Sequence, residues 1–185
     1  PLTLLDFDQK LEIGIVEMGA NHKKEINFLC QLAQPDIGLI TNFGEAHLEG
    51  FGGYEGVIKG KSELYDYPSQ TKGTIVLNSD DTLQKKWKYY SPHFTYGEDV
   101  EADCHLEYLK RKSKHLAIRL KGKTIESQLY SEYNYPNIAG AVALGKYFDL
   151  TLEEIKLGIL SYKPTNNRSQ IIHRGSNTIT CLLYT

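Results

Sequence analysis

The sequence predicts an α/β protein with a mostly parallel, Rossmann-like sheet flanked by helices and a small antiparallel β meander. Two observations support this prediction. An apolar, β-branched run, an amphipathic helix and a second apolar run follow one another within about 30 residues, the usual size of a right-handed βαβ unit. Between residues 103 and 130 the pattern changes to stretches that alternate polar and apolar residues, which is typical of a meander.

The predicted βαβ unit comes first. Residues 12–18 predict a buried strand, with Glu17 at its carboxyl end. An amphipathic helix follows, because apolar residues recur at i, i+3, i+4 and i+7; they are Ile26, Leu29, Cys30 and Ala33. Pro35 ends that helix, and residues 36–41 predict a second, parallel strand.

The alternation of strands and helices continues through the middle of the chain. A glycine-rich loop at 44–53 precedes a helix from about residue 54 to residue 65, whose apolar face also carries Lys61. Residues 73–77 predict another strand, and a turn leads from it into a helix at 83–89.

Turn and cap signals organise the remainder. Basic turns at 112–114 and 121–123 divide the meander. A proline in the first turn suits a helix over 136–148, and Thr151 with Glu154 forms a capping box for one more helix. At the level of domains, residues 1–162 predict one domain with a sizeable core, and 163–185 predict a polar linker and the truncated start of a further domain.

The composition argues against several classes of protein. The formal net charge of -2 gives no overall basic field that would attract nucleic acid or an anionic membrane. No apolar run approaches the roughly 20 residues that span a bilayer. The three cysteines are far apart and form no C-x-x-C pair, so we expect a cytoplasmic protein in a reducing environment.

Lys61 is the most unusual residue of the predicted helices. A charged amine on an apolar face lowers its pKa, finds a carboxylate or snorkels to solvent, and the residue alone favours snorkelling. Glu17 and His47 could both reach it, because sites in open α/β sheets lie at the carboxyl ends of strands. A carboxylate and an imidazole suit magnesium or manganese. The alternatives are a capping or salt-bridged Glu17 and a surface-loop His47.

Three polar residues follow the meander. Asn134 and Asn137 flank a proline, where they could cap the helix or present amides to a purine edge. Arg168 lies in the linker, where it could be solvated or hold phosphate oxygens. No G-x-x-x-x-G-K-[ST] loop occurs, and no G-x-G-x-x-G follows a strand, so the sequence contains no phosphate cradle that we can identify.

Three runs of the sequence resemble the Mur ligase family: E-M-G-A-N-H at 17–22, L-I-T-N-F-G-E-A-H-L-E-G-F-G at 39–52 and K-S-E-L-Y at 61–65. The A-H-L-E-G-F-G stretch is similar to the members that add D-alanyl-D-alanine. The resemblance covers nearly the whole chain, from a segment that follows the family's phosphate loop to the start of its C-terminal domain. It implies that residues 1–162 are a central, ATP-binding domain without its phosphate loop.

The resemblance also implies a metal site. Glu17 and His47 would bind Mg²⁺, and Lys61 would be carbamylated by carbon dioxide, so that its new carboxylate helps to hold the metal. This gives the placement of Lys61 a chemical reason, because carbamylation needs a neutral amine and burial favours the neutral form.

The same resemblance implies a nucleotide site for ATP. Asn134 and Asn137 match the family's H-N-x-x-N element near the adenine, although Tyr133 replaces the usual histidine. Asn137 is the better match for the adenine edge. Arg168 would approach the γ-phosphate from the domain junction.

The implied activity is ATP-dependent amide ligation in peptidoglycan precursor synthesis by a cytoplasmic, monomeric enzyme. The γ-phosphoryl group of ATP passes to the carboxylate of UDP-N-acetylmuramoyl-tripeptide, and the amine of D-alanyl-D-alanine attacks the acyl phosphate. We expect the chain alone to have little or no ligase activity, because the phosphate loop and most of the dipeptide-binding domain are absent. Residues 177–185 also lack the family's D-x-Y-N-x-N. The alternatives are a sibling Mur ligase, a folylpolyglutamate synthase-like ligase, or a non-catalytic α/β binding module.

Overall fold

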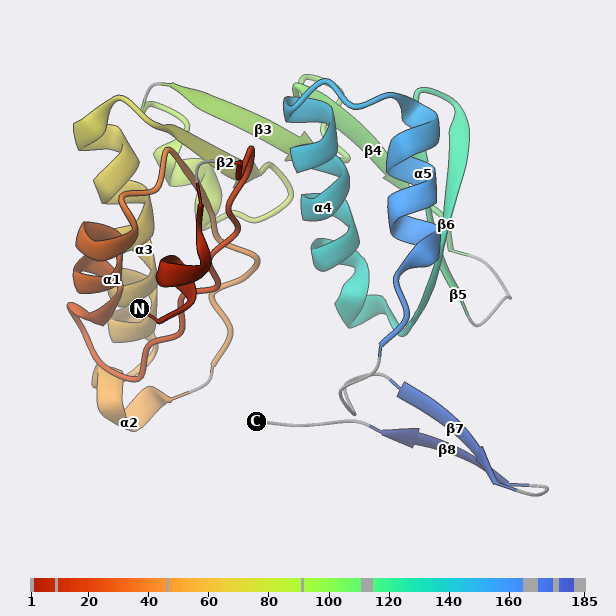
Figure 1. Cartoon of the computed structure of the whole chain (residues 1–185), viewed down its shortest axis with the longest axis horizontal. Helices are drawn as coiled ribbons and strands as arrows, with labels where there is room; N and C mark the ends of the chain where they lie inside the picture. The colour runs from red at the N-terminus through yellow and green to blue at the C-terminus, as the bar shows by residue number, and fades with distance from the viewer. Residues whose placement is uncertain are drawn as a thin grey trace. The chain divides into compact units, whose positions relative to one another are not determined.

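The structure is a computed structural model of the 185-residue chain. It describes residues 2–8, 10–45, 47–90, 92–110, 115–164, 170–174 and 177–181. The chain divides into two compact units, the first made of Pro1–Leu77 and Trp87–His93 and the second of Asn78–Lys86 and Phe94–Thr185. Figure 1 colours the chain from red at its N-terminus to blue at its C-terminus.

The first unit combines helices with a pair of parallel strands. Its elements are the 3-10 helix η1 (Leu2–Asp6), α1 (Glu25–Ala33), β1 (Ile37–Leu39), α2 (Leu48–Phe51), α3 (Tyr54–Thr71) and β2 (Thr74–Asn78). Strands β1 and β2 are parallel, and helices α1 and α3 lie side by side (Figure 1). The buried side chains of this unit include Ile26, Cys30, Phe43, Phe51, Val57, Tyr65, Ile75 and Val76.

Helix α1 confirms the helix predicted from its apolar spacing. Ile26 and Cys30 on its apolar face are buried. The helix ends where Gln34 takes a left-handed conformation (φ 48°) and donates its N–H to the carbonyl of Cys30 at 2.8 Å. Pro35 follows directly, and a proline cannot continue a helix, so the chain turns into β1.

Glycines allow α2 to pack closely on α3. A Cβ on Gly56 would lie 1.9 Å from the carbonyl oxygen of Phe51, and a Cβ on Gly60 would lie 2.3 Å from its ring. Phe51 is itself buried, so it has no room to move aside. Gly52 and Gly53 connect the two helices with φ values of 74° and 101°, which favour glycine.

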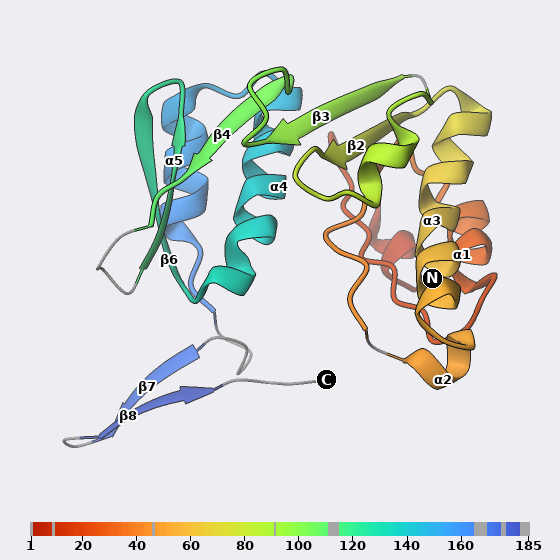
Figure 2. The same ribbon diagram turned by 180° about the vertical axis from the view of Figure 1, so that it is seen from behind.

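The second unit contains the meander and two covering helices. Its elements are β3 (His93–Gly97), β4 (Cys104–Tyr108), β5 (His115–Leu120), β6 (Lys123–Tyr130), the 3-10 helix η3 (Glu132–Asn134), α4 (Tyr135–Tyr147), α5 (Leu152–Ser161) and the hairpin β7 (Gln170–Arg174) and β8 (Asn177–Cys181). Strand β3 pairs with β4 in parallel, and β4, β5 and β6 are antiparallel. Helices α4 and α5 lie side by side against the meander (Figures 1 and 2).

These elements confirm the predicted α/β class with an antiparallel meander. The capping box is also confirmed, because the Thr151 hydroxyl accepts the N–H of Glu154 and the Glu154 carboxylate accepts the N–H of Thr151 at 2.8 Å. Strand β3 was not predicted. The predicted boundary at 162/163 remains a prediction, and residues 165–169 of the predicted linker lie outside the described residues.

The predicted strand at 12–18 is wrong. The segment has no regular secondary structure, and the side chains of Ile13 and Ile15 are 50% and 81% exposed. A strand needs a neighbour for its backbone hydrogen bonds and a covered face for its side chains. No strand within the described part of the chain pairs with this segment.

Two predicted helices differ in length. The helix predicted at 83–89 is a single 3-10 turn, η2 (Gln84–Trp87), and Asp81 accepts the N–H groups of Leu83 and Gln84 at its start. Helix α3 continues beyond the predicted end at residue 65 to Thr71, with Pro68 in its last turns. Within the described residues, no helix combines the length and the apolar character needed to cross a bilayer.

Replacing Gly56 with alanine should lower the free energy of unfolding by at least about 1–3 kcal/mol, because the new methyl group overlaps the Phe51 carbonyl. Gly158 in α5 is the matched control, since nothing lies within 4 Å of its ideal Cβ. Gly158→Ala should stabilise by about 0.5–1 kcal/mol through helix propensity. Urea denaturation followed by circular dichroism measures both. Equal effects at the two glycines would show that the contact between α2 and α3 is not as tight as described.

Candidate functional site

Lys61 of α3 holds the loop that follows β1. Its Nζ donates hydrogen bonds to the carbonyl oxygens of Asn42, at 3.1 Å, and Phe43. Phe43 is buried and its ring stacks on Trp87 with the centroids 6.2 Å apart, so this part of the loop is firmly anchored. Burial lowers the pKa of the Lys61 amine. The snorkelling alternative is therefore not what the structure shows, because the amine points to backbone carbonyls and is half-buried.

Glu17 and His47 have exposed side chains in the same unit. His47 takes a left-handed conformation (φ 59°) at the N-cap of α2, without capping it through its ring. Among the described residues, neither side chain has a hydrogen-bond or ion-pair partner. An exposed carboxylate and an exposed imidazole that have no other partner can act as ligands for a hard cation. The described residues contain no cluster of three or more His, Cys, Asp or Glu side chains that could hold a metal without a further donor.

The main chain after Glu17 lies against the helix that starts after His47. A Cβ on Gly50 of α2 would lie only 2.2 Å from the carbonyl oxygen of Asn21. The loop from β1 that leads to His47 is itself fixed by Lys61. The structure thus brings the segments that carry the three residues into one unit, although it shows no direct contact among their side chains.

Two further residues of α3 contribute to this arrangement and were not singled out from the sequence. The Tyr65 hydroxyl donates to the carbonyl of Val76 at 3.0 Å and accepts the N–H of Ile40 at 3.4 Å. The Glu63 carboxylate accepts two backbone N–H groups near the start of α1. The sequence signal was available, because both residues belong to the K-S-E-L-Y run, but spacing alone does not reveal distant backbone partners.

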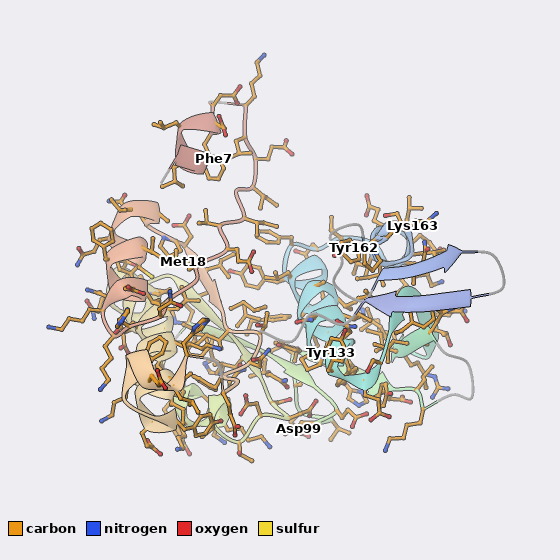
Figure 3. The ribbon with its side chains drawn as sticks, turned by 90° about the horizontal axis from the view of Figure 1, so that it is seen from below. Phe7, Met18, Asp99, Tyr133, Tyr162 and Lys163 are labelled. Atoms are coloured by element: carbon orange, nitrogen blue, oxygen red, sulfur yellow. The ribbon has the colours of Figure 1, made fainter. Side chains whose placement is uncertain are left out.

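The predicted asparagines lie at the start of α4 in the second unit. Asn134 is buried, and its Nδ2 donates to the carbonyl of Tyr130 at 2.7 Å. Asn137 is exposed, and its Nδ2 donates to Asn134 Oδ1 at 3.4 Å. Tyr133, labelled in Figure 3, is 54% exposed. Arg168 lies outside the described residues.

Acidic and aromatic side chains gather near these asparagines at the ends of β3 and β4. The Asp80 carboxylate accepts the N–H of Glu98 at 2.9 Å, and the Glu98 carboxylate accepts the N–H of Tyr108 at 2.7 Å. The Tyr108 ring lies 4.9 Å from the ring of Tyr135. Burial raises the pKa of Asp80. The carboxyl ends of parallel strands are where open α/β sheets bind ligands.

Two hydroxyl groups in this region have no hydrogen-bond partner among the described residues. They belong to Tyr96 and Tyr135, and both are buried. Burial is also the main cause that raises the pKa of each phenol. Apart from the N-S-D-D run after the strand at 73–77, no sequence pattern pointed to this cluster.

Comparison with protein families finds the Mur ligase middle domain over residues 1–145. The UDP-N-acetylmuramoyl-tripeptide--D-alanyl-D-alanine ligase of Bacillus subtilis (strain 168) is 30% identical over 178 residues, covering 95% of this chain and 38% of the relative. The ligase of the same name from Haemophilus influenzae is 33% identical over 164 residues, covering 86% of this chain and 35% of the relative. The chain therefore spans less than two fifths of the length of these relatives.

Solved structures share the fold. A crystal structure of MurF from Acinetobacter baumannii has a TM-score of 0.83 at 24% identity and covers 99% of this chain and 41% of that one. The MurF ligase from Thermotoga maritima in complex with ADP has a TM-score of 0.73 at 22% identity, with 89% and 39% covered. At these identities the likeness concerns the fold alone.

Replacing Lys61 with methionine should lower the free energy of unfolding by about 1–3 kcal/mol, because the part-buried carbonyl of Phe43 and the exposed carbonyl of Asn42 both lose their donor. The pKa of Lys61 in the folded protein lies below its ordinary value of 10.5, so the folded state releases the proton at a lower pH than the unfolded chain. The unaltered protein should therefore gain stability over the variant as the pH rises through the folded-state pKa towards 10.5.

Urea unfolding at a series of neutral and alkaline pH values measures this difference. Lys59→Met is the control, since Lys59 is exposed on the same helix, and its effect should stay within about 0.5 kcal/mol. A difference between the unaltered protein and Lys61→Met that does not change with pH would contradict the assignment.

Proposed function

This chain belongs to the Mur ligase family, and on that premise we propose that it is the central, ATP-binding part of a MurF-type ligase. The proposed enzyme joins D-alanyl-D-alanine to UDP-N-acetylmuramoyl-tripeptide in peptidoglycan precursor synthesis in the cytoplasm. The observation that carries this proposal is the match of the middle domain over residues 1–145 together with two relatives of that name. Because the chain spans only part of those relatives, both substrates are proposed for the full-length protein.

The proposed reaction has two steps. A carboxylate oxygen of the tripeptide attacks the γ-phosphorus of ATP, the bond to the β-phosphate oxygen breaks, and ADP leaves. The amine of D-alanyl-D-alanine then attacks the acyl carbon of the resulting acyl phosphate, and inorganic phosphate leaves as the amide forms and the amine loses a proton. Both steps gather negative charge, which cations near the phosphates offset.

The proposed metal ligands are Glu17, His47 and a carbamylated Lys61. Bound Mg²⁺ would supply positive charge that stabilises the phosphoryl group during its transfer. The donor set fits Mg²⁺, because the side chains of Glu17 and His47 are exposed and have no partner among the described residues. Burial lowers the pKa of Lys61, which favours the neutral amine that reacts with carbon dioxide. The product keeps a single N–H, so carbamylation leaves a donor for only one of the two carbonyls that Lys61 now holds.

The proposed adenine contact is Asn137. The amide of Asn134 already bonds to the chain at Tyr130, so its role is to fix the start of α4. Asn137 is exposed one turn later, and its carboxamide can present both a donor and an acceptor to a purine. The ADP complex of the Thermotoga maritima relative supports a nucleotide site in this fold. Arg168 is proposed to contact the γ-phosphate.

The full-length protein should release ADP only when the UDP-linked tripeptide and D-alanyl-D-alanine are both present. A coupled assay for ADP with a panel of amino donors tests this, and preference for a single amino acid would favour a sibling ligase instead.

Glu17→Gln and His47→Gln should each lower kcat/KM by about 100-fold or more, since each removes a group that supports the transition-state charge. Glu12→Gln, an exposed change in the same segment, should leave it unaltered.

Bicarbonate enriched in ¹³C should produce a carbamate resonance that is present in the unaltered protein and in Lys59→Ala but absent in Lys61→Ala. Carbamylation requires the neutral amine, so the signal should grow as the pH rises. Short carboxylates should restore part of the activity of Lys61→Ala, because they can occupy the place of the carbamate. A bare amine at Lys61 in high bicarbonate, seen by mass spectrometry under native conditions, would count against this assignment.

A further inference from the structure

The Glu63 carboxylate accepts two backbone N–H groups at the start of α1, and the proposed reaction gives Glu63 no role. One oxygen of its carboxylate accepts the N–H of Lys24 at 2.8 Å and the other accepts the N–H of Asn27 at 2.9 Å. We propose that Glu63 is a positioning residue, which acts through α1 to hold the carboxylate of Glu17 in place for the metal. The inference rests on the metal site proposed above and adds a residue to it.

Helix α1 needs a cap from elsewhere in the chain. The first N–H groups of a helix have no partner within it. The N-cap residue Lys24 has a left-handed conformation (φ 71°) and makes no side-chain cap. Glu63 supplies that cap from 36 and 39 residues away, and its negative charge also suits the positive end of the helix dipole. The start of α1 is therefore fixed by α3.

The segment that carries Glu17 is in turn fastened to α1. The thiol of Cys30 donates to the sulfur of Met18 at 3.8 Å, and Cys30 is fully buried in α1. Met18 is labelled in Figure 3. Glu25 in the first turn of α1 accepts the N–H groups of residues 21 and 22 at 2.7 and 3.1 Å. Because this segment has no regular structure of its own, its position depends on these contacts.

The same turn of α3 also holds the other proposed ligands. Lys61 lies two residues before Glu63 and fixes the loop that leads to His47. Movement at Glu63 would therefore shift the carboxylate of Glu17 relative to the other two ligands, which remain attached to α3. Groups that orient a metal ligand without binding the metal themselves commonly raise the metal affinity by about 10- to 100-fold.

The test uses Glu63→Gln in the full-length protein and two measurements. Without ligands, hydrogen exchange in peptides that cover residues 17–33 should become at least about 10-fold faster, because a glutamine has one acceptor oxygen where the carboxylate has two. The Mg²⁺ concentration for half-maximal ligation should rise by about 10-fold or more, while the KM for D-alanyl-D-alanine stays the same. Glu63→Ala, which removes both acceptor oxygens, should enlarge both effects.

Two matched variants separate positioning from general destabilisation. Glu55→Gln makes the same chemical change at an exposed site on α3. Ser62→Ala, next to Glu63, removes a part-buried hydrogen bond to the Ile58 carbonyl. Neither should alter exchange in residues 17–33 or the Mg²⁺ requirement. In a Glu17→Gln background, Glu63→Gln should cause no further change in the Mg²⁺ requirement, since its effect passes through Glu17.

The possible failures are distinct. Unchanged exchange in Glu63→Gln, or faster exchange with an unchanged Mg²⁺ requirement, would overturn this inference and leave the proposed function intact. Equal changes in hydrogen exchange and in the Mg²⁺ requirement of Ser62→Ala would mean that Glu63 only stabilises the fold. Ligation by the unaltered protein without any divalent metal would overturn the metal site and this inference with it.

Discussion

The turn of α3 from Lys61 to Tyr65 is the constraint on which the arrangement of the first unit depends. Each of its three long polar side chains fixes a different segment. Lys61 holds the loop after β1, Glu63 holds the start of α1, and Tyr65 holds the end of β1 and the middle of β2. A helix presents successive side chains at fixed angles, so one rigid element sets the spacing of segments that are far apart in sequence.

The fold could be predicted where the determining pattern is local. The apolar spacing of α1, the basic turn between β5 and β6 and the capping box at Thr151 all act within a few residues, and the structure confirms each. The other predicted basic turn, at 112–114, lies outside the described residues. The segment at 12–18 shows the limit of this reasoning. Its composition suits a strand, but a strand exists only when another strand pairs with it, and composition does not supply a neighbour. Strand β3 was missed for a related reason: His93–Gly97 alternates polar and aromatic residues, but a run of five residues does not show which strand pairs with it.

The candidate site could be predicted only in part. Lys61 was recognisable because a lysine on an apolar helix face is unusual, and the structure shows its side chain half-buried. Its role as a metal ligand stays a prediction. Its actual partners are backbone carbonyls of Asn42 and Phe43, and no sequence pattern identifies a carbonyl as an acceptor. The buried hydroxyls of Tyr96 and Tyr135 were likewise invisible, because tyrosines of this kind become notable only once their surroundings are known.

Among the side chains that the structure describes, each unit contains one buried thiol, Cys30 in the first and Cys104 in the second. Burial raises the pKa of each to about 11, so neither forms the thiolate that reacts with alkylating reagents at neutral pH. Reaction at either cysteine therefore requires its unit to open. These two cysteines are thus internal reporters, and the rate at which each one is labelled gives the opening frequency of its own unit, without any engineered probe.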